Sequence, residues 1–168
     1  VNFRVVDKAE GKTKNDYFQD MLDEVLAWGL EPAFVTGDSW YSCVSNLKRI
    51  KNHQMGLLFA LESNRLVSVE KGSWVQVQQL EIPVDGLVVW LKNFGQVKLF
   101  RTQLKDQLRH YISALPSDEQ TTSFDHKALN EQNDRHWQIA QYHRAIKQVC
   151  NIEHFQVRSK GAIKNHLF

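Results

Sequence analysis

Residues 33–61 read AFVTGDSWYSCVSNLKRIKNHQMGLLFAL, and this stretch decides the fold class. It begins and ends with short apolar runs, residues 33–37 and 55–61, of the kind found in buried strands. Between them Val44, Leu47 and Ile50 recur at the spacing of one helix face, and Ser39 or Ser42 is expected to open that helix. The order strand–helix–strand predicts an α/β protein whose sheet is covered by helices.

The preceding residues extend this alternation. Residues 1–7 have the pattern of a strand, and a helix is predicted from Asn15 or Asp16 to Gly29, with Pro32 blocking its continuation. The apolar residues of that helix share one face: Phe18, Met21, Leu22, Val25 and Leu26. Because the chain lacks a starting Met and opens within a strand pattern, we expect it to be a fragment of a longer protein.

The middle of the chain is rich in β-strand signals. Four predicted strands are separated by turn residues: residues 66–70, 74–82, 87–92 and 97–101. Within the second, valine alternates with glutamine, the pattern of a strand with one wet face. Residues 111–115 are expected to add a strand and residues 116–123 a polar loop. A helix is predicted over about residues 134–150, and a last one from Ser159 onward.

Length and composition set the class of protein. The chain has 168 residues, a formal net charge of +2, 42% hydrophobic and 24% charged residues, which suits one ordinary globular domain. No run approaches the ~20 apolar residues of a membrane-spanning helix, so a membrane protein is not expected. Two cysteines, Cys43 and Cys150, are too few for a disulfide scaffold and fit a reducing cytosol.

Basic residues are concentrated near the C-terminus. From residue 135 onward there are six lysines and arginines against one glutamate: Arg135, Arg144, Lys147, Arg158, Lys160, Lys164 and Glu153. This is either a solvated helix face or a surface that binds phosphate. If the six basic groups each touched phosphate, affinity would fall steeply with salt.

Asp38 directly follows the first apolar run, at the carboxyl end of a predicted strand. In α/β sheets ligands bind at this edge, and a carboxylate there suits Mg²⁺, which prefers oxygen ligands. Two interpretations stay open for Asp38: a metal ligand, or the N-cap of a helix that begins at Ser39. The adjacent Trp40 and Tyr41 suit either stacking on a displaced base or packing in the core.

Other kinds of chemistry find less support in the sequence. Four residues at roughly helical spacing lack the close pairs of a zinc site: His136, His143, Cys150 and His154. Neither cysteine lies in a signature that activates a nucleophile. The glycine spacing gives neither a P-loop nor a dinucleotide fingerprint.

Two longer motifs carry a resemblance to a known family. Residues 35–42 read VTGDSWYS, and residues 136–148 read HWQIAQYHRAIKQ. The first resembles the second acidic motif of DDE transposases of bacterial insertion sequences. The second is similar to their third motif, whose usual form is Arg/His-Trp-x-Ile-Glu-x-x-His/Phe-Arg-x-x-Lys-Gln. Shorter stretches also fit, some of them a branch associated with cyanobacterial transposases: residues 11–15, 46–48, 152–159 and 165–166.

The resemblance covers nearly the whole chain and implies an RNase H-like fold. Such a fold is a mixed sheet flanked by helices, here with a β-rich insertion before the last catalytic helix. Residues 1–62 would be the first part of the core without its first strand, residues 63–115 the insertion, and residues 116–168 the C-terminal helices. The long separation between Asp38 and position 140 fits members with such an insertion.

The same resemblance implies a DNA transposase that cuts and joins insertion-sequence ends. Three carboxylates in the family bind two Mg²⁺ or Mn²⁺ ions, which activate water or a DNA 3′-OH and stabilise the leaving oxygen. The implied partner is double-stranded DNA, both as transposon ends and as target. Paired-end transposition implies a homodimer. The expected location is the bacterial cytoplasm, in association with the nucleoid and not with a membrane.

Two departures from the family pattern bear on activity. Ala140 occupies the position of the third carboxylate and has no atom to bind a metal. The first catalytic Asp belongs on a strand that this chain lacks, and Asp7 precedes the family's Gly-Lys-Thr-Lys segment and is not expected to replace it. With Asp38 as the single clear carboxylate, we predict little or no strand-transfer activity. Ala140 is open to two origins, an engineered substitution or natural decay of a mobile element.

The third motif also predicts contacts with DNA. Lys147 lies two helical turns beyond Ala140, and in related transposases a lysine at this spacing contacts phosphate near the scissile bond. Arg144 is one turn from both, and His136, one turn before Ala140, stands where many relatives carry Arg. Further along the basic tail, Arg158 and Lys160 are expected to bind DNA as well. Without the motif, these residues would be interpreted as an ordinary surface helix.

Three rival functions remain at this point. One is a catalytically dead DNA-binding domain descended from a transposase. Another is an RNase H-like nuclease of a different family, which the third motif disfavours. The last is an α/β domain whose partner is a protein, which would be supported if no duplex DNA bound at low salt.

Overall fold

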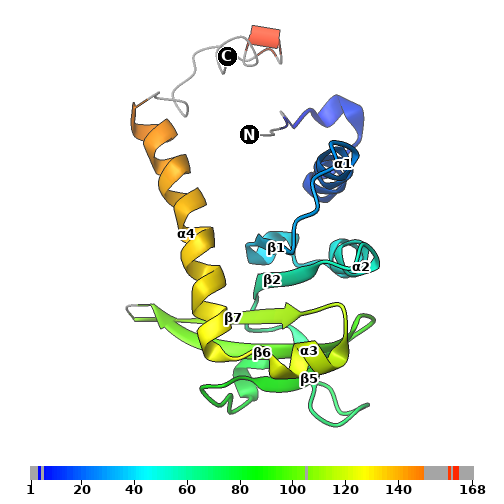
Figure 1. Ribbon diagram of the computed structural model, residues 1–168, viewed down its shortest axis with the longest axis vertical. Helices are drawn as coiled ribbons and strands as arrows, with labels where there is room; N and C mark the ends of the chain where they lie inside the picture. Colours follow the sequence, from blue (N-terminus) through cyan, green and yellow to red (C-terminus); the bar gives the residue numbers. More distant parts are fainter. Residues whose placement is uncertain (1–3, 5, 105, 150–158, 160, 163–168) are drawn as a thin grey trace. The chain divides into compact units, whose positions relative to one another are not determined.

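The computed structural model describes residues 4, 6–104, 106–149, 159 and 161–162 (Figure 1). The chain forms two compact units. One unit is Glu31–Asn133, and the other combines Val1–Leu30 with Asp134–Phe168.

A seven-stranded mixed sheet forms the centre of the first unit, in the order β1-β2-β7-β6-β5-β3-β4. Its strands are β1 (Phe34–Gly37), β2 (Gly56–Leu61), β3 (Leu66–Ser68), β4 (Val75–Gln76), β5 (Leu87–Leu91), β6 (Gly95–Leu104) and β7 (Gln107–Ala114). Strands β1 and β2 are parallel, and the remaining pairs are antiparallel. The predicted α/β class with a mixed sheet and flanking helices is confirmed.

The predicted strand–helix–strand unit is present as β1, α2 (Val44–Asn52) and β2. The predicted start of the helix is wrong. Cys43 is its N-cap and makes no side-chain cap bond, whereas Ser39 opens the short 3₁₀ turn η2 (Ser39–Tyr41). The Ser42 hydroxyl donates to the Ser39 carbonyl at 2.7 Å, so this hydroxyl is used inside the turn.

Helices cover both faces of the sheet. On one face, Leu58 and Phe100 pack with Phe124 and Leu129, and the Phe124 ring lies 5.9 Å from that of Phe100. Phe124 directly follows α3 (Asp118–Ser123), and Leu129 lies near the start of α4 (His126–Val149). The opposite face includes the buried Phe59, and α2, with Leu47 and Ile50 fully buried, packs against β2. Burial of these large apolar side chains is the main stabilising term of the unit.

Two other predicted elements in this unit are wrong. Residues 74–82 are not one strand, because β4 is followed at once by the 3₁₀ turn η3 (Val77–Gln79), which Gln76 and Gln79 close with a capping box. Residues 116–123 are not a loop but contain α3, which the Ser117–Gln120 capping box begins. The helix predicted over about residues 134–150 is present within α4, which begins earlier, at His126.

In the other unit, α1 (Lys14–Ala27) confirms the predicted first helix, but its N-cap is Thr13. Thr13 and Asp16 form a capping box, while Gly29 at φ +75° ends the helix, with its N–H donating to the Leu26 carbonyl. Of the predicted strand over residues 1–7, the described residues 4, 6 and 7 are not in a strand. The helix predicted from Ser159 lies mostly outside the described residues.

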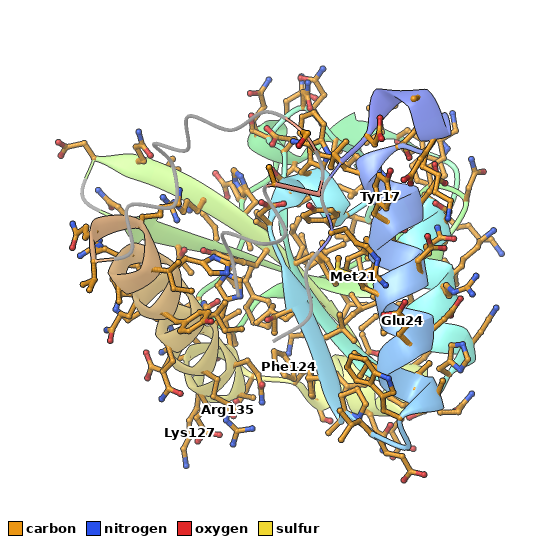
Figure 2. The ribbon with its side chains drawn as sticks, turned by 90° about the horizontal axis from the view of Figure 1, so that it is seen from above. Tyr17, Met21, Glu24, Phe124, Lys127 and Arg135 are labelled. Carbon is orange, nitrogen blue, oxygen red and sulfur yellow. The ribbon has the colours of Figure 1, made fainter. Side chains whose placement is uncertain are left out.

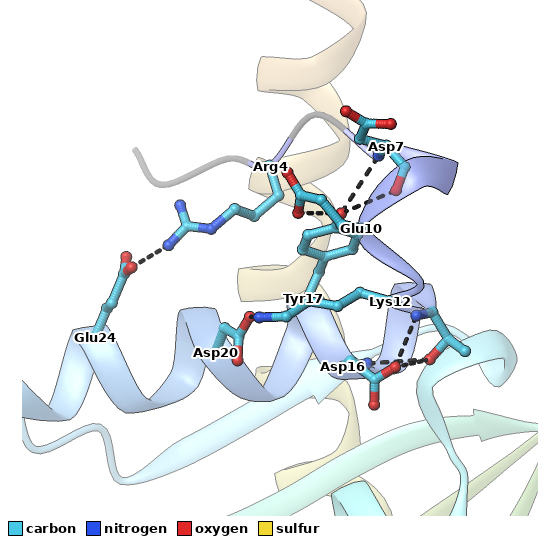
Figure 3. Close-up of polar contacts among 9 residues, drawn as sticks. Arg4, Asp7, Glu10, Lys12, Asp16, Tyr17, Asp20 and Glu24 are labelled. Carbon is cyan, nitrogen blue, oxygen red and sulfur yellow. Dashed lines mark hydrogen bonds and ion pairs between the residues drawn. The ribbon is translucent and has the colours of Figure 1, made fainter. Parts of the chain in front are cut away.

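Polar contacts hold the start of this unit against α1 (Figure 3). The buried Tyr17 hydroxyl donates to Glu10 at 2.7 Å and accepts the Asp7 N–H at 3.3 Å. Lys12 pairs with Asp20 at 2.6 Å, and Arg4 pairs with Glu24. These contacts connect the segment before α1, which includes the 3₁₀ turn η1 (Lys8–Glu10), to that helix.

Candidate functional site

Asp38 lies directly after the last residue of β1, at the carboxyl end of the strand. Its Oδ1 accepts the Trp40 N–H at 3.0 Å, so Asp38 is the N-cap of η2. The carboxylate is nevertheless exposed. An N-cap and a metal ligand are compatible roles, because the cap uses one of two carboxylate oxygens.

A second carboxylate stands beside this turn. Glu62 directly follows β2, and its Oε1 accepts a hydrogen bond from the Ser39 hydroxyl. Because β1 and β2 are parallel, Asp38 and Glu62 lie at the same edge of the sheet. We did not identify Glu62 from the sequence, although it shows the same signal as Asp38, an acidic residue that directly follows an apolar run.

The turn that carries Asp38 is fixed from several sides. Buried Asn46 on α2 donates from Nδ2 to the Tyr41 carbonyl at 3.1 Å, and Arg65 reaches the Ser42 carbonyl at 3.5 Å. Burial raises the pKa of the Tyr41 phenol, and the negative charge of Asp38 raises it further. Tyr41 is therefore a neutral hydrogen-bonding group at neutral pH.

Trp40 is more exposed to solvent than its neighbour Tyr41 in the same turn. Its side chain is 64% exposed, whereas Tyr41 is half-buried. Core packing is thus the wrong interpretation for Trp40. An exposed indole beside Asp38 has a ring face on which a base can stack.

The residues of the third motif lie on α4. His136, Ala140, Arg144 and Lys147 recur every three or four positions and so share one face of this helix. Arg144 and Lys147 are exposed, and His136 and Ala140 are half-buried. The Arg144 guanidinium lies 5.9 Å from the centre of the Trp137 ring, a cation–π contact.

Two further basic residues lie on α4. Lys127 and Arg135 extend outward from α4 (Figure 2). The predicted DNA contacts Arg158 and Lys160 lie outside the described residues.

Asp38 belongs to the unit Glu31–Asn133, and Ala140, Arg144 and Lys147 belong to the other unit.

The donor set does not fit a two-metal centre. Among the residues that the structure describes, no three or more His, Cys, Asp or Glu side chains come together to hold a metal ion. Ala140 offers a methyl group where the resemblance implied a carboxylate. Asp7, the other acidic candidate considered, uses its Oδ1 to accept the Ala9 N–H at 2.9 Å in η1.

Comparison with known proteins assigns the family. The family model described as the transposase DDE domain matches residues 3–168. The chain therefore belongs to the DDE transposase domain family, which confirms the resemblance to DDE transposases. No curated protein and no solved structure matches the chain. In the part of the chain that the structure describes, no helix is long and apolar enough to cross a membrane.

Proposed function

We propose that this chain is the catalytic-domain portion of an insertion-sequence transposase, able to bind DNA but with little or no strand-transfer activity as written. The observation that carries the proposal is Ala140, which interrupts an otherwise well-matched third motif on α4. The family match over residues 3–168 supports the transposase part. Ala140 also supports the inactivity, because without a carboxylate at this position the third motif supplies no oxygen ligand for two hard cations.

Each residue has a role in this proposal. Asp38, fixed by its turn, is one metal-ligand position of the ancestral site. In an intact enzyme, a Mg²⁺ or Mn²⁺ pair would supply activation of the attacking oxygen and stabilisation of the leaving oxygen. Arg144 and Lys147 are positioned to bind phosphate with exposed cationic groups, with His136 on the same helix face. Arg158 and Lys160 are assigned the same role from the sequence.

The proposal extends to the protein's setting. Double-stranded DNA, as transposon ends and as target, is the partner, and a homodimer would pair two ends. The bacterial cytoplasm, close to the nucleoid, is the proposed location. The divisions at residues 62/63 and 115/116 are proposed as the boundaries of the β-rich insertion.

A nicking assay on cognate ends tests the activity. With Mg²⁺ or Mn²⁺ we expect no cleavage above background from the chain as written, and robust metal-dependent cleavage would refute the proposal. Ala140→Glu, tested in the longest protein that the gene encodes, should restore cleavage that Asp38→Asn abolishes. If the restored protein binds DNA but never cleaves it, the chain is instead a DNA-binding domain that descends from a transposase and has lost its catalytic activity.

DNA binding is tested separately by fluorescence anisotropy with a labelled duplex. We expect binding at low salt that weakens steeply as salt increases. Arg144→Gln with Lys147→Gln should weaken it, whereas Lys14→Gln with Lys127→Gln removes two basic groups outside the motif and should have less effect. Absence of duplex binding at low salt would favour a protein partner.

A further inference from the structure

Strands β6 and β7 continue as a two-stranded ribbon beyond their neighbours. Pairing of β5 with β6 ends at Leu87↔Leu99, and pairing of β2 with β7 ends at Leu61↔His110. Strands β6 and β7 still pair with each other as far as Leu104↔Gln107. Residues 101–104 and 106–109, here called the β6–β7 ribbon, therefore have no third strand beside them among the described residues (Figure 1).

The ribbon is basic and exposed. Residues 101–109 read RTQLKDQLR, with three basic residues and one acidic residue. The Arg101 and Arg109 side chains are both exposed. By contrast, the nearby Lys98 is buried and donates to the Thr122 carbonyl at 2.8 Å, a structural role that the ribbon arginines do not share.

No carboxylate faces either arginine across the ribbon. Arg101 pairs with His110, and Arg109 pairs with Thr102. An acidic residue opposite either arginine would stabilise the pairing of the two strands. The residues found there do not form such an ion pair with the arginines. The positive charge of Arg101 acts on its neighbour His110. Burial lowers the pKa of His110, and the Arg101 charge lowers it further.

The rest of the ribbon suits a polar, sequence-tolerant contact. Gln103, Gln107 and Thr102 carry neutral hydrogen-bonding groups, and Leu108 is 60% exposed. Arg109 and Arg101 lie on opposite faces, because Arg109 adjoins His110, the cross-strand partner of Arg101. A ribbon with a cationic group on each face can reach phosphates on both sides of a DNA groove.

The ribbon extends from the edge of the sheet that carries Asp38. Strand β2 runs toward the ribbon, because its last residue, Leu61, pairs with His110. Strand β1 is parallel to β2, so Asp38 follows it at the same end. The turn between β5 and β6, which contains Lys92, lies at the opposite end of the sheet.

We propose that the β6–β7 ribbon binds duplex DNA, with Arg101 and Arg109 contacting backbone phosphates near the Asp38 edge of the sheet. The proposal rests on the DNA-binding function proposed above and adds a second contact surface, separate from the third motif on α4. The major groove admits a two-stranded ribbon, and most protein–DNA hydrogen bonds go to phosphate and sugar.

The test is a salt titration of duplex binding by fluorescence anisotropy at pH 8, where His110 is neutral. Arg101→Gln with Arg109→Gln should make the slope of log K against log salt shallower by about 1.8, from ~0.9 per phosphate contact. The Kd at moderate salt should rise roughly tenfold or more. Arg101→Lys with Arg109→Lys keeps both charges and should retain most of the slope.

The matched control removes two other exposed charges from the same unit, by Lys48→Gln with Lys92→Gln. Its slope should stay close to that of the unmodified chain, and thermal melting should show all variants folded. If the arginine variant binds as the unmodified chain does, or the control loses as much affinity, the ribbon inference is wrong and the proposed function stands. If the unmodified chain binds no duplex at low salt, the proposed function fails, and the ribbon inference with it.

Discussion

Gly37 allows the end of β1 to lie directly over a fully buried aromatic ring. A Cβ atom at position 37 would stand 2.5 Å from Cε1 of Phe59, and the Phe59 side chain is fully buried. The glycine is thus needed for close packing and not for an unusual backbone angle. Since Asp38 is the next residue, the same contact fixes the base of the turn that carries this carboxylate.

We therefore predict that Gly37→Ala destabilises the protein by about 1–3 kcal/mol, the usual cost of overpacking a core. Denaturant unfolding measures the change. In the Phe59→Leu background the cost of Gly37→Ala should be clearly smaller, because the ring that the new methyl group meets is gone. Equal costs in both backgrounds would contradict the close contact between these two residues.

His110 supplies a pH-dependent contribution to stability. Burial and then the Arg101 charge lower the pKa of its imidazole in the folded state, whereas an unfolded histidine titrates near ~6.5. Between these two values the unfolded chain binds more protons, so stability rises with pH in that window.

The expected result is a fall in the free energy of unfolding as pH is lowered from about 7.5 to below ~6.5, toward the folded-state pKa of His110. His110→Gln should make this fall smaller, since glutamine does not titrate. Chemical denaturation of both proteins across this pH range measures the difference. Identical pH profiles for the two proteins would show that His110 is not the group responsible.

At the scale of elements, strong periodicity was informative and short turns were not. The α2 region and α1 were predictable because apolar residues recur on one face over several turns. Helix α3 has six residues and no apolar stripe, so only the Ser117–Gln120 capping pattern could have revealed it. The alternation at Val75 and Val77 predicted a longer strand. Instead, β4 ends where a side-chain capping box begins the 3₁₀ turn η3, and the periodicity does not show this end.

The candidate site divides in the same way. Asp38 was predictable from the strand that precedes it, and position 140 from a resemblance over a long motif. Glu62 carried the same signal as Asp38 and was missed. The β6–β7 ribbon was not predictable, because strand register decides which strands extend past their neighbours. Register depends on pairing between distant parts of the chain, which local patterns do not specify.

A side-chain hydrogen bond connects α3 to the residue that follows β7. Buried Thr121 accepts the Leu115 N–H at 2.8 Å through its Oγ1, which also lies 2.9 Å from the Ser117 carbonyl. Thr121→Val keeps the shape but leaves the Leu115 N–H without this acceptor, so we predict a loss of about 1–3 kcal/mol. The neighbouring Thr122 is exposed, and Thr122→Val should cost much less in the same thermal or denaturant unfolding experiment. Equal losses would show that the Thr121 bond does not secure α3.

At the scale of the whole molecule, a net charge of +2 conceals two basic surfaces. One is the β6–β7 ribbon in the unit Glu31–Asn133, and the other is the third-motif face of α4 in the remaining unit. Nonspecific DNA affinity depends on the number of phosphates neutralised and not on net charge. A nearly neutral chain can therefore bind DNA with a steep salt dependence.

The two surfaces are distinguished by additivity. We predict that the ribbon pair Arg101→Gln with Arg109→Gln, and the helix pair Arg144→Gln with Lys147→Gln, each make the salt slope shallower by about 1.8. The fourfold variant should lose about 3.6, because residues without shared phosphates contribute independently. Anisotropy titrations of all four proteins at several salt concentrations measure these slopes. A fourfold variant no weaker than the more affected pair would mean that a single surface contacts DNA in the complex, and the assignment of the other surface would be wrong.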